Sequence, residues 1–238
     1  MGADRPRSPF GARRRSYSQN FLASRTLAAQ LVREANVERG DLVVEIGAGS
    51  GILTAELARL AGRVLAIEID PAWAARLRHR FAQRRNVEVI EGDALRVRLP
   101  DELFRVVANI PFGATSALLR RLLDDPRTSL TRADLVLQWD VARKRAGRPR
   151  TVLSASWTPW WRFRLGRRLP RAAFRPPPAV DAGVLVVERR RDPLLPLEAH
   201  EAFEQFVRGL FTGTLARELD ARQWAALYAT YIGDESTV

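Results

Sequence analysis

The 238-residue sequence contains no cysteine, which excludes a disulfide framework and any metal site built on thiolates. It has only two histidines, His79 and His200, so a histidine-rich centre is not expected and we predict no metal. No run approaches the roughly 18 consecutive apolar residues of a membrane-spanning helix, and the arginine-studded N-terminus lacks the apolar stretch of a secretory signal. We therefore expect a cytoplasmic protein that does not contact a membrane.

Lysine is also nearly absent, because Lys144 is the single lysine among 39 basic residues in a chain of net charge +12. The excess charge is concentrated in two segments. Residues 1 to 40 carry +5, from eight arginines against three acidic residues, and residues 141 to 191 carry +12, from fourteen basic residues against two acidic ones. Residues 41 to 140 are neutral, and residues 192 to 238 carry −5. Two concentrated basic segments favour a polyanion such as nucleic acid as the partner.

Short apolar runs alternate with stretches of helical period along the middle of the chain. The runs that predict strands are 42–46, 64–69, 87–90, 104–108 and 133–141, and the stretches that predict helices are 51–61, 71–83 and 113–123. Strands that are apolar throughout and separated by helices are typical of βαβ units in a parallel sheet covered on both faces. A later apolar run at 183–188 predicts an antiparallel strand added at the end of this sheet.

The two ends of the chain differ in character from the middle. Residues 1–16 are rich in arginine, proline and glycine and have no apolar period, which predicts a basic flexible arm. Residues 17–190 are predicted to form the α/β domain. Beyond them the pattern becomes helical and acidic, so residues 191–238 are predicted to form a small helical domain with helices at 198–211 and 215–231.

Glycines and acidic residues follow the first three predicted strands, at the edge where open α/β sheets bind ligands. The first strand ends in Glu45–Gly51 (EIGAGSG), which departs from the dinucleotide fingerprint G-x-G-x-x-G because Ile52 occupies its last position. Glu68 ends the second strand, where a carboxylate can accept the hydroxyl protons of a ribose. Asp93 follows the third strand and can accept a hydrogen bond from an adenine amino group. Together these residues predict a ligand that contains adenosine.

The fourth predicted strand ends in Asn109–Phe112 (NIPF). An exocyclic amine on an aromatic ring is a poor nucleophile because its lone pair is delocalised, so a catalyst must accept its N–H protons. The Asn109 side-chain oxygen and the Ile110 carbonyl, held rigid by Pro111, can supply these acceptors. Phe112 can stack on the base. A methyl-sulfonium donor is already activated, so aligned dipoles in a dry pocket suffice and no strong general base is required.

The ordered set of motifs resembles the rRNA adenine N6-methyltransferases, from about Arg15 to about Glu188. The motifs that carry the resemblance are Ser18–Leu22 (SQNFL), Glu45–Gly51, Glu68, Gly92–Ala94, Asn109–Phe112 and Phe174–Asp181 (FRPPPAVD). The forms SQNFL and NIPF and the short C-terminal tail resemble the erythromycin-resistance (Erm) branch more closely than the small-subunit adenine dimethylases. The resemblance implies an α/β fold with the Rossmann-like sheet of class I S-adenosylmethionine-dependent methyltransferases and a small C-terminal helical domain.

The resemblance also implies an activity, a cofactor and a set of site residues. S-adenosylmethionine would be the methyl donor, and one adenine in the peptidyl-transferase region of 23S rRNA would be mono- or dimethylated at N6. The outcome would be resistance to macrolides, lincosamides and streptogramin B. The implied cofactor-binding residues are Asn20, Leu22, Gly47, Glu68, Asp93, Ala94 and Asn109. The implied catalytic residues are Asn109, Ile110, Phe112 and Phe174, of which the two phenylalanines would enclose a base turned out of its stack.

An enzyme that acts on RNA needs basic side chains to contact the phosphates. We predict that the N-terminal arm, an exposed basic loop at 143–150 and neighbouring arginines make these contacts. The predicted RNA-binding residues are Arg13, Arg14, Arg15, Arg143, Lys144, Arg145, Arg148, Arg150, Arg162 and Arg164. The tryptophans Trp157, Trp160 and Trp161 are predicted to belong to the core. We expect a monomer that acts on free 23S rRNA or on early assembly particles.

Two alternative functions remain open from the sequence. A small-subunit (16S) rRNA adenine dimethyltransferase would carry the same motifs and act in ribosome maturation. A non-catalytic nucleic-acid-binding factor could keep the fold and the cofactor pocket, although the intact Asn109–Phe112 motif weighs against it. A small-molecule amine methyltransferase is disfavoured because the charge of residues 141 to 191 would then have no partner.

Overall fold

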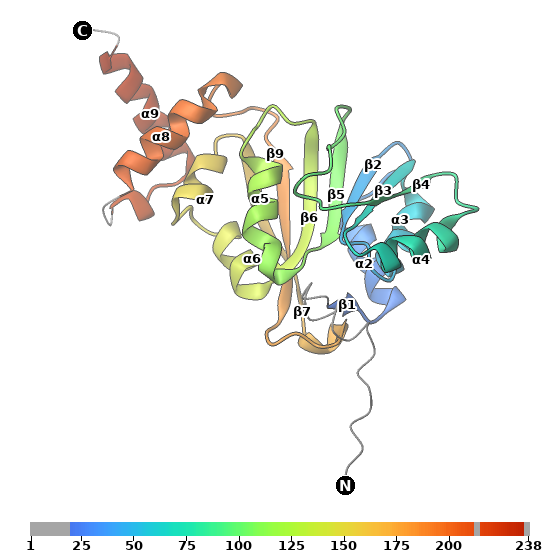
Figure 1. Ribbon diagram of the computed structural model, residues 1–238. Helices are drawn as coiled ribbons and strands as arrows, with labels where there is room; N and C mark the ends of the chain where they lie inside the picture. Colours follow the sequence, from blue (N-terminus) through green and yellow to red (C-terminus); the bar gives the residue numbers. More distant parts are fainter. Residues whose placement is uncertain (1–19, 212–214, 236–238) are drawn as a thin grey trace.

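The fold is built around one seven-stranded sheet in the order β4-β3-β2-β5-β6-β9-β7. Figure 1 shows it in a computed structural model of the chain, which describes residues 20–211 and 215–235. The strands are β2 (Leu42–Ile46), β3 (Arg63–Glu68), β4 (Val87–Glu91), β5 (Phe104–Asn109), β6 (Leu130–Gln138), β7 (Trp161–Leu169) and β9 (Ala182–Arg189). Strands β2 to β6 pair in parallel, and β9 is antiparallel to both β6 and β7. The predicted α/β sheet with an antiparallel addition is confirmed, but β9 is not at the end of the sheet, because β7, which was not predicted, pairs with it and forms the edge.

Helices cover both faces of the sheet because alternate residues of its strands point to opposite sides. The covering helices are α2 (Arg25–Glu34), α3 (Ile52–Leu60), α4 (Pro71–Phe81), α5 (Thr115–Leu123) and α6 (Trp139–Ala146). In β2, Val43 belongs to the apolar cluster of α2 and α3, whereas Val44 belongs to that of α5 and α6. The continuous apolar runs of the sequence therefore reflect strands that are buried on both sides.

The helix starts follow local capping rules. Ser24 caps α2, since its hydroxyl accepts the N–H of Leu27 at 3.3 Å. Asp70 caps α4 by accepting the N–H of Ala72 at 2.8 Å, and Pro71 occupies the first helical position. Both caps lie beside strand ends, so these short contacts position the backbone at the edge of the sheet where the site forms.

The exposed basic loop predicted at 143–150 is wrong in its first half, because α6 continues through Ala146. Arginine and lysine favour helix, and the fully buried Ala142 anchors the helix on the core. The same helix corrects the predicted strand at 133–141. The apolar run includes Trp139, but this residue begins α6, and β6 ends at Gln138.

The three tryptophans of the aromatic-rich stretch are buried, as predicted. Trp157 ends α7 (Val152–Trp157) and donates its indole N–H to Asp124 Oδ1 at 2.7 Å. Trp160 donates to the carbonyl of Leu195 at 3.0 Å, and Trp161 to that of Leu123 at 3.3 Å. Each of these three indoles thus has a polar partner, and Trp160 connects the sheet to the C-terminal segment.

The two predicted C-terminal helices are present as α8 (His200–Leu210) and α9 (Ala221–Glu235). They lie beyond α7 in Figure 1, at the opposite end of the sheet from β4. Phe203 and Trp224 join the same apolar cluster as Trp160. The second helix begins later than predicted, because Asp220 accepts the N–H groups of the first turn of α9. No helix in the described part of the chain is long and apolar enough to cross a membrane.

Candidate active site

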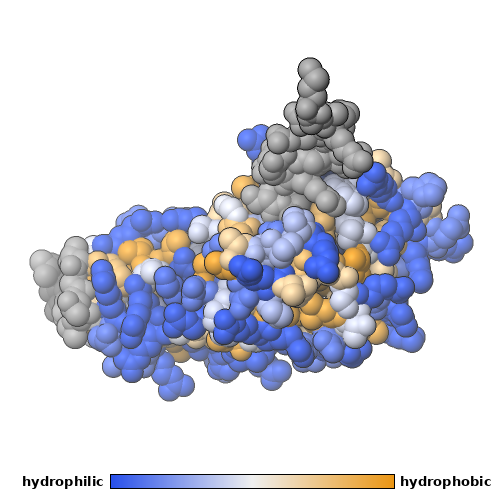
Figure 2. Space-filling view, turned by 90° about the horizontal axis from the view of Figure 1, so that it is seen from below, coloured by the Kyte–Doolittle hydropathy of each residue, from blue (hydrophilic) through white to orange (hydrophobic). Residues whose placement is uncertain are grey.

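A pocket of about 280 Å³ lies where β2, β3, β4 and β5 end, near the lower limit of roughly 300 Å³ typical of small-molecule sites. The chain order reverses at this point, since β3 and β4 continue on one side of β2 and β5 begins on the other. Figure 2 views the molecule from this edge and shows hydrophobic patches between hydrophilic margins. The predicted residues that line the pocket are Asn20, Gly47, Glu68, Asp93, Ala94, Asn109, Ile110 and Phe112.

The turn after β2 approaches the pocket with backbone atoms alone. Gly47, Gly49 and Gly51 all have positive φ angles, of 74°, 51° and 73°, which favour glycine. The N–H of Gly47 donates to the carbonyl of Ile67 at 2.9 Å and fastens the turn to β3. A Cβ atom added at Gly49 would lie 2.8 Å from Cδ1 of Phe21. The turn is therefore covered by an aromatic ring at Gly49, while Gly47 faces the pocket.

Glu68 ends β3 with a side chain that is almost entirely buried. Its Oε2 accepts the N–H of Gly49 at 2.7 Å, and its Oε1 accepts the N–H of Asp70 at 2.9 Å. Burial raises the pKa of Glu68 above its ordinary value, while the two backbone donors oppose that shift by stabilising the carboxylate. Each carboxylate oxygen retains a second lone pair, so Glu68 can still accept hydrogen bonds from the hydroxyl groups of a ligand.

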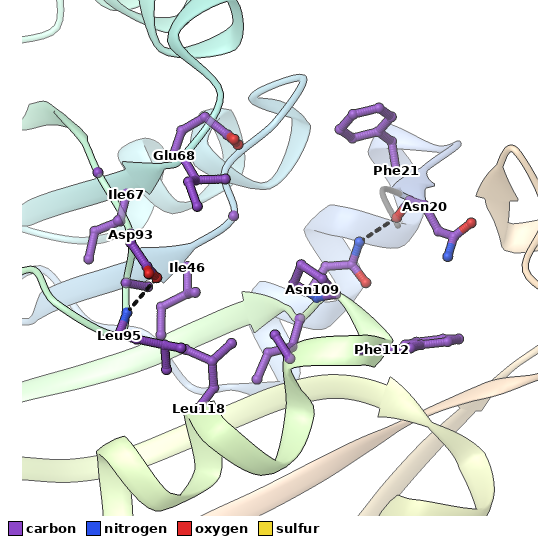
Figure 3. A pocket seen from close by; sticks show the side chains of 18 residues that line it. Asn20, Phe21, Ile46, Ile67, Glu68, Asp93, Leu95, Asn109, Phe112 and Leu118 are labelled. Carbon is purple, nitrogen blue, oxygen red and sulfur yellow. Dashed lines mark hydrogen bonds between the residues drawn. The ribbon is translucent and has the colours of Figure 1, made fainter. Parts of the chain in front are cut away.

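Asp93 follows β4 and is shaped by a short turn, in which its Oδ1 accepts the N–H of Leu95 at 2.9 Å (Figure 3). Two apolar pocket residues beside the acidic ones were not predicted. Ile69 and Leu95 line the pocket and are 41% and 38% exposed, which is typical of apolar side chains that contact a ligand. The position of both residues close to Glu68 and Asp93 in the sequence was the signal that could have indicated a ligand contact. An apolar residue in a turn can equally serve packing, so this signal was not specific.

Asn109 ends β5 with its side chain turned toward the N-terminal segment. Its Nδ2 donates to the carbonyl of Asn20 at 2.7 Å (Figure 3). Within the described residues no group donates to Asn109 Oδ1, so this oxygen is available as an acceptor. The next residue, Ile110, is buried and donates its N–H to the carbonyl of Val136 at 3.0 Å, which holds the turn on β6. Phe112 follows as a half-buried residue of the pocket lining.

Two of the predicted site residues do not line the pocket. Leu22 and Phe174 are both buried in the cluster between the sheet and α2. The cause is the pairing of β1 (Phe21–Leu22) with β8 (Phe174–Arg175), in which Leu22 lies opposite Phe174. Paired residues of adjacent strands point to the same face, so both side chains turn inward and Phe21 points to the pocket instead.

This pairing bears on two of the expected roles. Phe21 occupies the position in the pocket that was expected of Leu22. The expected enclosure of a base between Phe112 and Phe174 is also not present in this conformation, because the side chain of Phe174 is fully buried.

The predicted RNA-binding residues fall into groups with different surroundings. Arg13, Arg14 and Arg15 lie outside the described residues. Three exposed arginines pair with carboxylates at N–O distances of 3.5, 3.3 and 3.2 Å: Arg143 with Asp140, Arg148 with Glu218, and Arg164 with Glu188. Three others are exposed and have no side-chain hydrogen bond or ion pair in the part of the chain that the structure describes: Lys144, Arg150 and Arg162.

Arg145 is held inside the molecule. Its guanidinium donates to Thr151 Oγ1 at 2.9 Å and to Ser154 Oγ at 2.7 Å, and lies 5.4 Å from the centre of the Trp157 ring. Burial lowers the pKa of Arg145 from its ordinary value. These contacts join α6 to α7, so they give no support to the prediction that Arg145 binds phosphate.

The family is decided by one comparison. The model of the family described as "Ribosomal RNA adenine dimethylase" matches residues 11–226, nearly the whole chain. The chain belongs to this family. An rRNA adenine N-6-methyltransferase of Corynebacterium diphtheriae is 41% identical over 206 residues, which are 86% of this chain and 80% of that protein. The predicted resemblance is confirmed, and the chain is an rRNA adenine N6-methyltransferase of the Erm type.

Two further relatives of this methyltransferase extend the comparison. The mycinamicin-resistance protein MyrB of Micromonospora griseorubida is 34% identical and is matched over 94% of this chain and 81% of its own. The crystal structure of the 23S rRNA methyltransferase ErmE superposes with a TM-score of 0.74 at 35% identity, over 85% of this chain and 86% of that chain. The fold therefore matches that of a solved rRNA methyltransferase over most of the chain.

Proposed function

We propose that this methyltransferase transfers a methyl group from S-adenosylmethionine to N6 of one adenine in the peptidyl-transferase region of 23S rRNA. The product would give resistance to macrolides, lincosamides and streptogramin B. The observation that carries the proposal is the orientation of Asn109, whose Nδ2 is engaged by the Asn20 carbonyl while Oδ1 is left as an acceptor. The similarity to the 23S rRNA methyltransferase ErmE supports this target, and the similarity to the mycinamicin-resistance protein MyrB supports this outcome.

The chemistry of the pocket fits S-adenosylmethionine. Glu68 would accept the ribose hydroxyls and Asp93 the adenine amino group, with Ala94 beside it. Ile69 and Leu95 would pack on the adenine ring. The methionine end would lie against the backbone of Gly47, where a glycine leaves the closest approach. The cofactor would supply a methyl group that its positive sulfonium activates.

The residues after β5 act on the target amine. Asn109 Oδ1 and the carbonyl of Ile110 would accept its two N–H groups, which draws the nitrogen lone pair out of the ring and toward the methyl group. Pro111, with φ at −55°, keeps this pair of acceptors rigid. Phe112 would stack on the base, and we assign this role to Phe112 alone because Phe174 is buried. The proton of the product leaves to water after transfer, so no side chain needs to act as a strong base.

The function is tested by supplying radiolabelled S-adenosylmethionine to the purified protein with two acceptors, protein-free 23S rRNA and intact small ribosomal subunits. We expect label on a single adenine of the peptidyl-transferase region in the free 23S rRNA, located by primer extension and counted as one or two methyl groups by mass spectrometry. Label confined to the small subunit would instead make the protein a 16S rRNA dimethyltransferase. Binding to either acceptor without transfer of label would instead favour the non-catalytic nucleic-acid-binding factor.

The predicted RNA contacts can be tested by comparing basic residues that have no carboxylate partner among the described residues with basic residues that have one. Changing Lys144, Arg150 and Arg162 to glutamine removes three charges that have no acidic partner among the described residues. The logarithm of the RNA-binding constant falls linearly with the logarithm of the salt concentration, and each lost phosphate contact makes this slope less steep by about 0.7 to 0.9. The slope of the triple variant should therefore be less steep by about 2 units. The measurement is RNA binding by filter retention between 50 mM and 300 mM salt, on the order of the range in which such slopes are linear.

The matched control changes Arg143, Arg148 and Arg164 to glutamine. It removes the same formal charge, but each of these arginines already has a carboxylate partner. We expect a loss of less than about 1 unit of slope in this variant. Equal losses in the two triple variants would show that only the total charge matters and would overturn the assignment of the RNA face.

A further inference from the structure

The aromatic ring of Phe21 packs over the glycine turn that follows β2. It lines the pocket, and it occupies the space in which a Cβ atom of Gly49 would stand. Glycine at position 49 thus makes room for an aromatic ring supplied by the N-terminal segment, in addition to allowing the positive φ of the turn. The ring of Phe21 and the glycine turn are complementary in shape. The position of Phe21 also depends on the side chains that pack against its ring.

The ring of Phe21 packs against the ring of Trp73. The centroids of the two rings are 5.1 Å apart with an interplanar angle of 55°, an arrangement that is favourable for aromatic pairs. Trp73 lies in the first turn of α4, which starts at the Asp70 cap beside Glu68. The guanidinium of Arg76, in the next turn of the helix, lies 5.0 Å from the centre of the Trp73 ring. Trp73 is half-buried and is not itself part of the pocket lining.

The place of Phe21 also determines the place of the Asn20 carbonyl, because the two residues are adjacent in the chain. That carbonyl accepts the hydrogen bond from Asn109 Nδ2 at 2.7 Å. Figure 3 shows Phe21 and Asn20 on one side of the pocket and Asn109 reaching toward them from β5. A continuous set of contacts therefore leads from α4 through the N-terminal segment to the amide at the end of β5.

We infer that Trp73 is a positioning residue for methyl transfer, which holds Phe21 over the glycine turn and, through the Asn20 carbonyl, orients the Asn109 amide toward the target amine. The inference rests on the proposed function. Trp73 does not line the pocket, so its loss acts on geometry. A displacement of about 1 Å at a catalytic group can lower a rate by about a hundredfold, and among the described residues the Asn109 amide has one hydrogen-bond partner, the Asn20 carbonyl.

The test compares Trp73→Leu with Trp73→Phe. Leucine removes the aromatic contact with Phe21, while phenylalanine keeps a ring at the same place. In single-turnover transfer to 23S rRNA, we expect Trp73→Leu to lower the rate by about tenfold or more and Trp73→Phe to stay within about threefold of the unmodified protein. The affinity for RNA, measured in the same series, should be unchanged in both variants.

A double-mutant cycle separates positioning from a merely structural role. Phe21→Leu, Trp73→Leu and the double variant are compared at a temperature at which circular dichroism shows all of them folded. If Trp73 acts through Phe21, Trp73→Leu should lower the rate by less than about twofold in the Phe21→Leu background. Full additivity of the two effects, or an unchanged rate in Trp73→Leu, would overturn the inference.

The matched control is Trp139→Leu. Trp139 is another half-buried tryptophan at the start of a helix with an arginine over its ring, since Arg168 lies 5.2 Å from its centroid, but it packs on Gly183 of β9 and does not line the pocket. We expect its folded variant to retain the transfer rate, and a loss equal to that of Trp73→Leu would also overturn the inference. Failure of the unmodified protein to methylate 23S rRNA would refute the proposed function instead.

Discussion

Asn109→Ala is expected to abolish methyl transfer while the cofactor still binds. The substitution removes Oδ1, the acceptor proposed for the target amine, and also the Nδ2 donor that ties the end of β5 to Asn20. Removal of one preorganised polar group of this kind lowers a rate by about 10²- to 10³-fold. The measurement is single-turnover transfer of labelled methyl groups to 23S rRNA.

The binding of S-adenosylhomocysteine is the control for the Asn109→Ala variant. Glu68 and Asp93, at the other end of the pocket, are untouched by the substitution, so affinity should fall by less than about tenfold, the equivalent of one hydrogen bond. A variant that transfers methyl groups at the normal rate would refute the role of Asn109. A variant that binds no S-adenosylhomocysteine would show that Asn109 serves the cofactor before it serves the amine.

Glu45→Gln is expected to stabilise the protein strongly at alkaline pH. Glu45 is 1% exposed near the end of β2, beneath the glycine turn, and its Oε2 has no hydrogen-bond partner within the described residues. Burial raises the pKa of Glu45 from 4.5 to about 8, the nearby charge of Glu68 adds to the rise, and Thr54 opposes part of it. The side chain is therefore protonated and neutral in the folded protein at neutral pH.

The sign of the pH dependence follows from this raised pKa. The folded state holds a proton that the unfolded state releases above pH 4.5, so the contribution of Glu45 to stability is complete below that value and is lost as the pH rises toward about 8. The slope is about 1.4 kcal/mol per pH unit. Glutamine has nearly the same shape and no proton to release. The free energy of unfolding of Glu45→Gln, minus that of the unmodified protein, should therefore increase by about 4 kcal/mol between pH 5 and pH 8.

Urea unfolding at pH 5, 6.5 and 8 measures this difference. Glu88→Gln is the control, because Glu88 is exposed on β4 and the same substitution there removes a carboxylate that is not buried. A flat difference for Glu45→Gln would mean that Glu45 is ionised in the folded protein, in which case a group that the present structure does not provide would have to compensate its charge.

The pocket residues at strand ends could be predicted because their positions follow from local sequence. An apolar run that ends in a turn places the next residue at the carboxyl edge of a parallel sheet, whatever the rest of the chain does. Glu68 lies near the end of such a run, Asp93 and Asn109 follow one, and all three line the pocket. Ile69 and Leu95 lie in the same turns, but their apolar character did not distinguish ligand contact from packing.

The aromatic residues of the site could not be predicted in the same way. A strand of two residues has no period from which its facing can be read, so the direction of Phe21 and Leu22 depends on the register of β1 with β8. That register also buries Phe174. The contact between Phe21 and Trp73 joins two segments about fifty residues apart and leaves no mark on either local pattern.

By itself the sequence determined the parallel α/β fold, the family and the order of the polar residues around the pocket, because these depend on local apolar runs and on the residues that end them. It also indicated a polyanionic partner from the distribution of charge. Only the tertiary structure decided which charges are free, since Arg148 meets Glu218 across 70 residues and Arg164 meets Glu188 across 24. It likewise decided which aromatic rings face the pocket, because strand register and long-range packing turn a side chain inward or outward while its neighbours in the sequence stay the same.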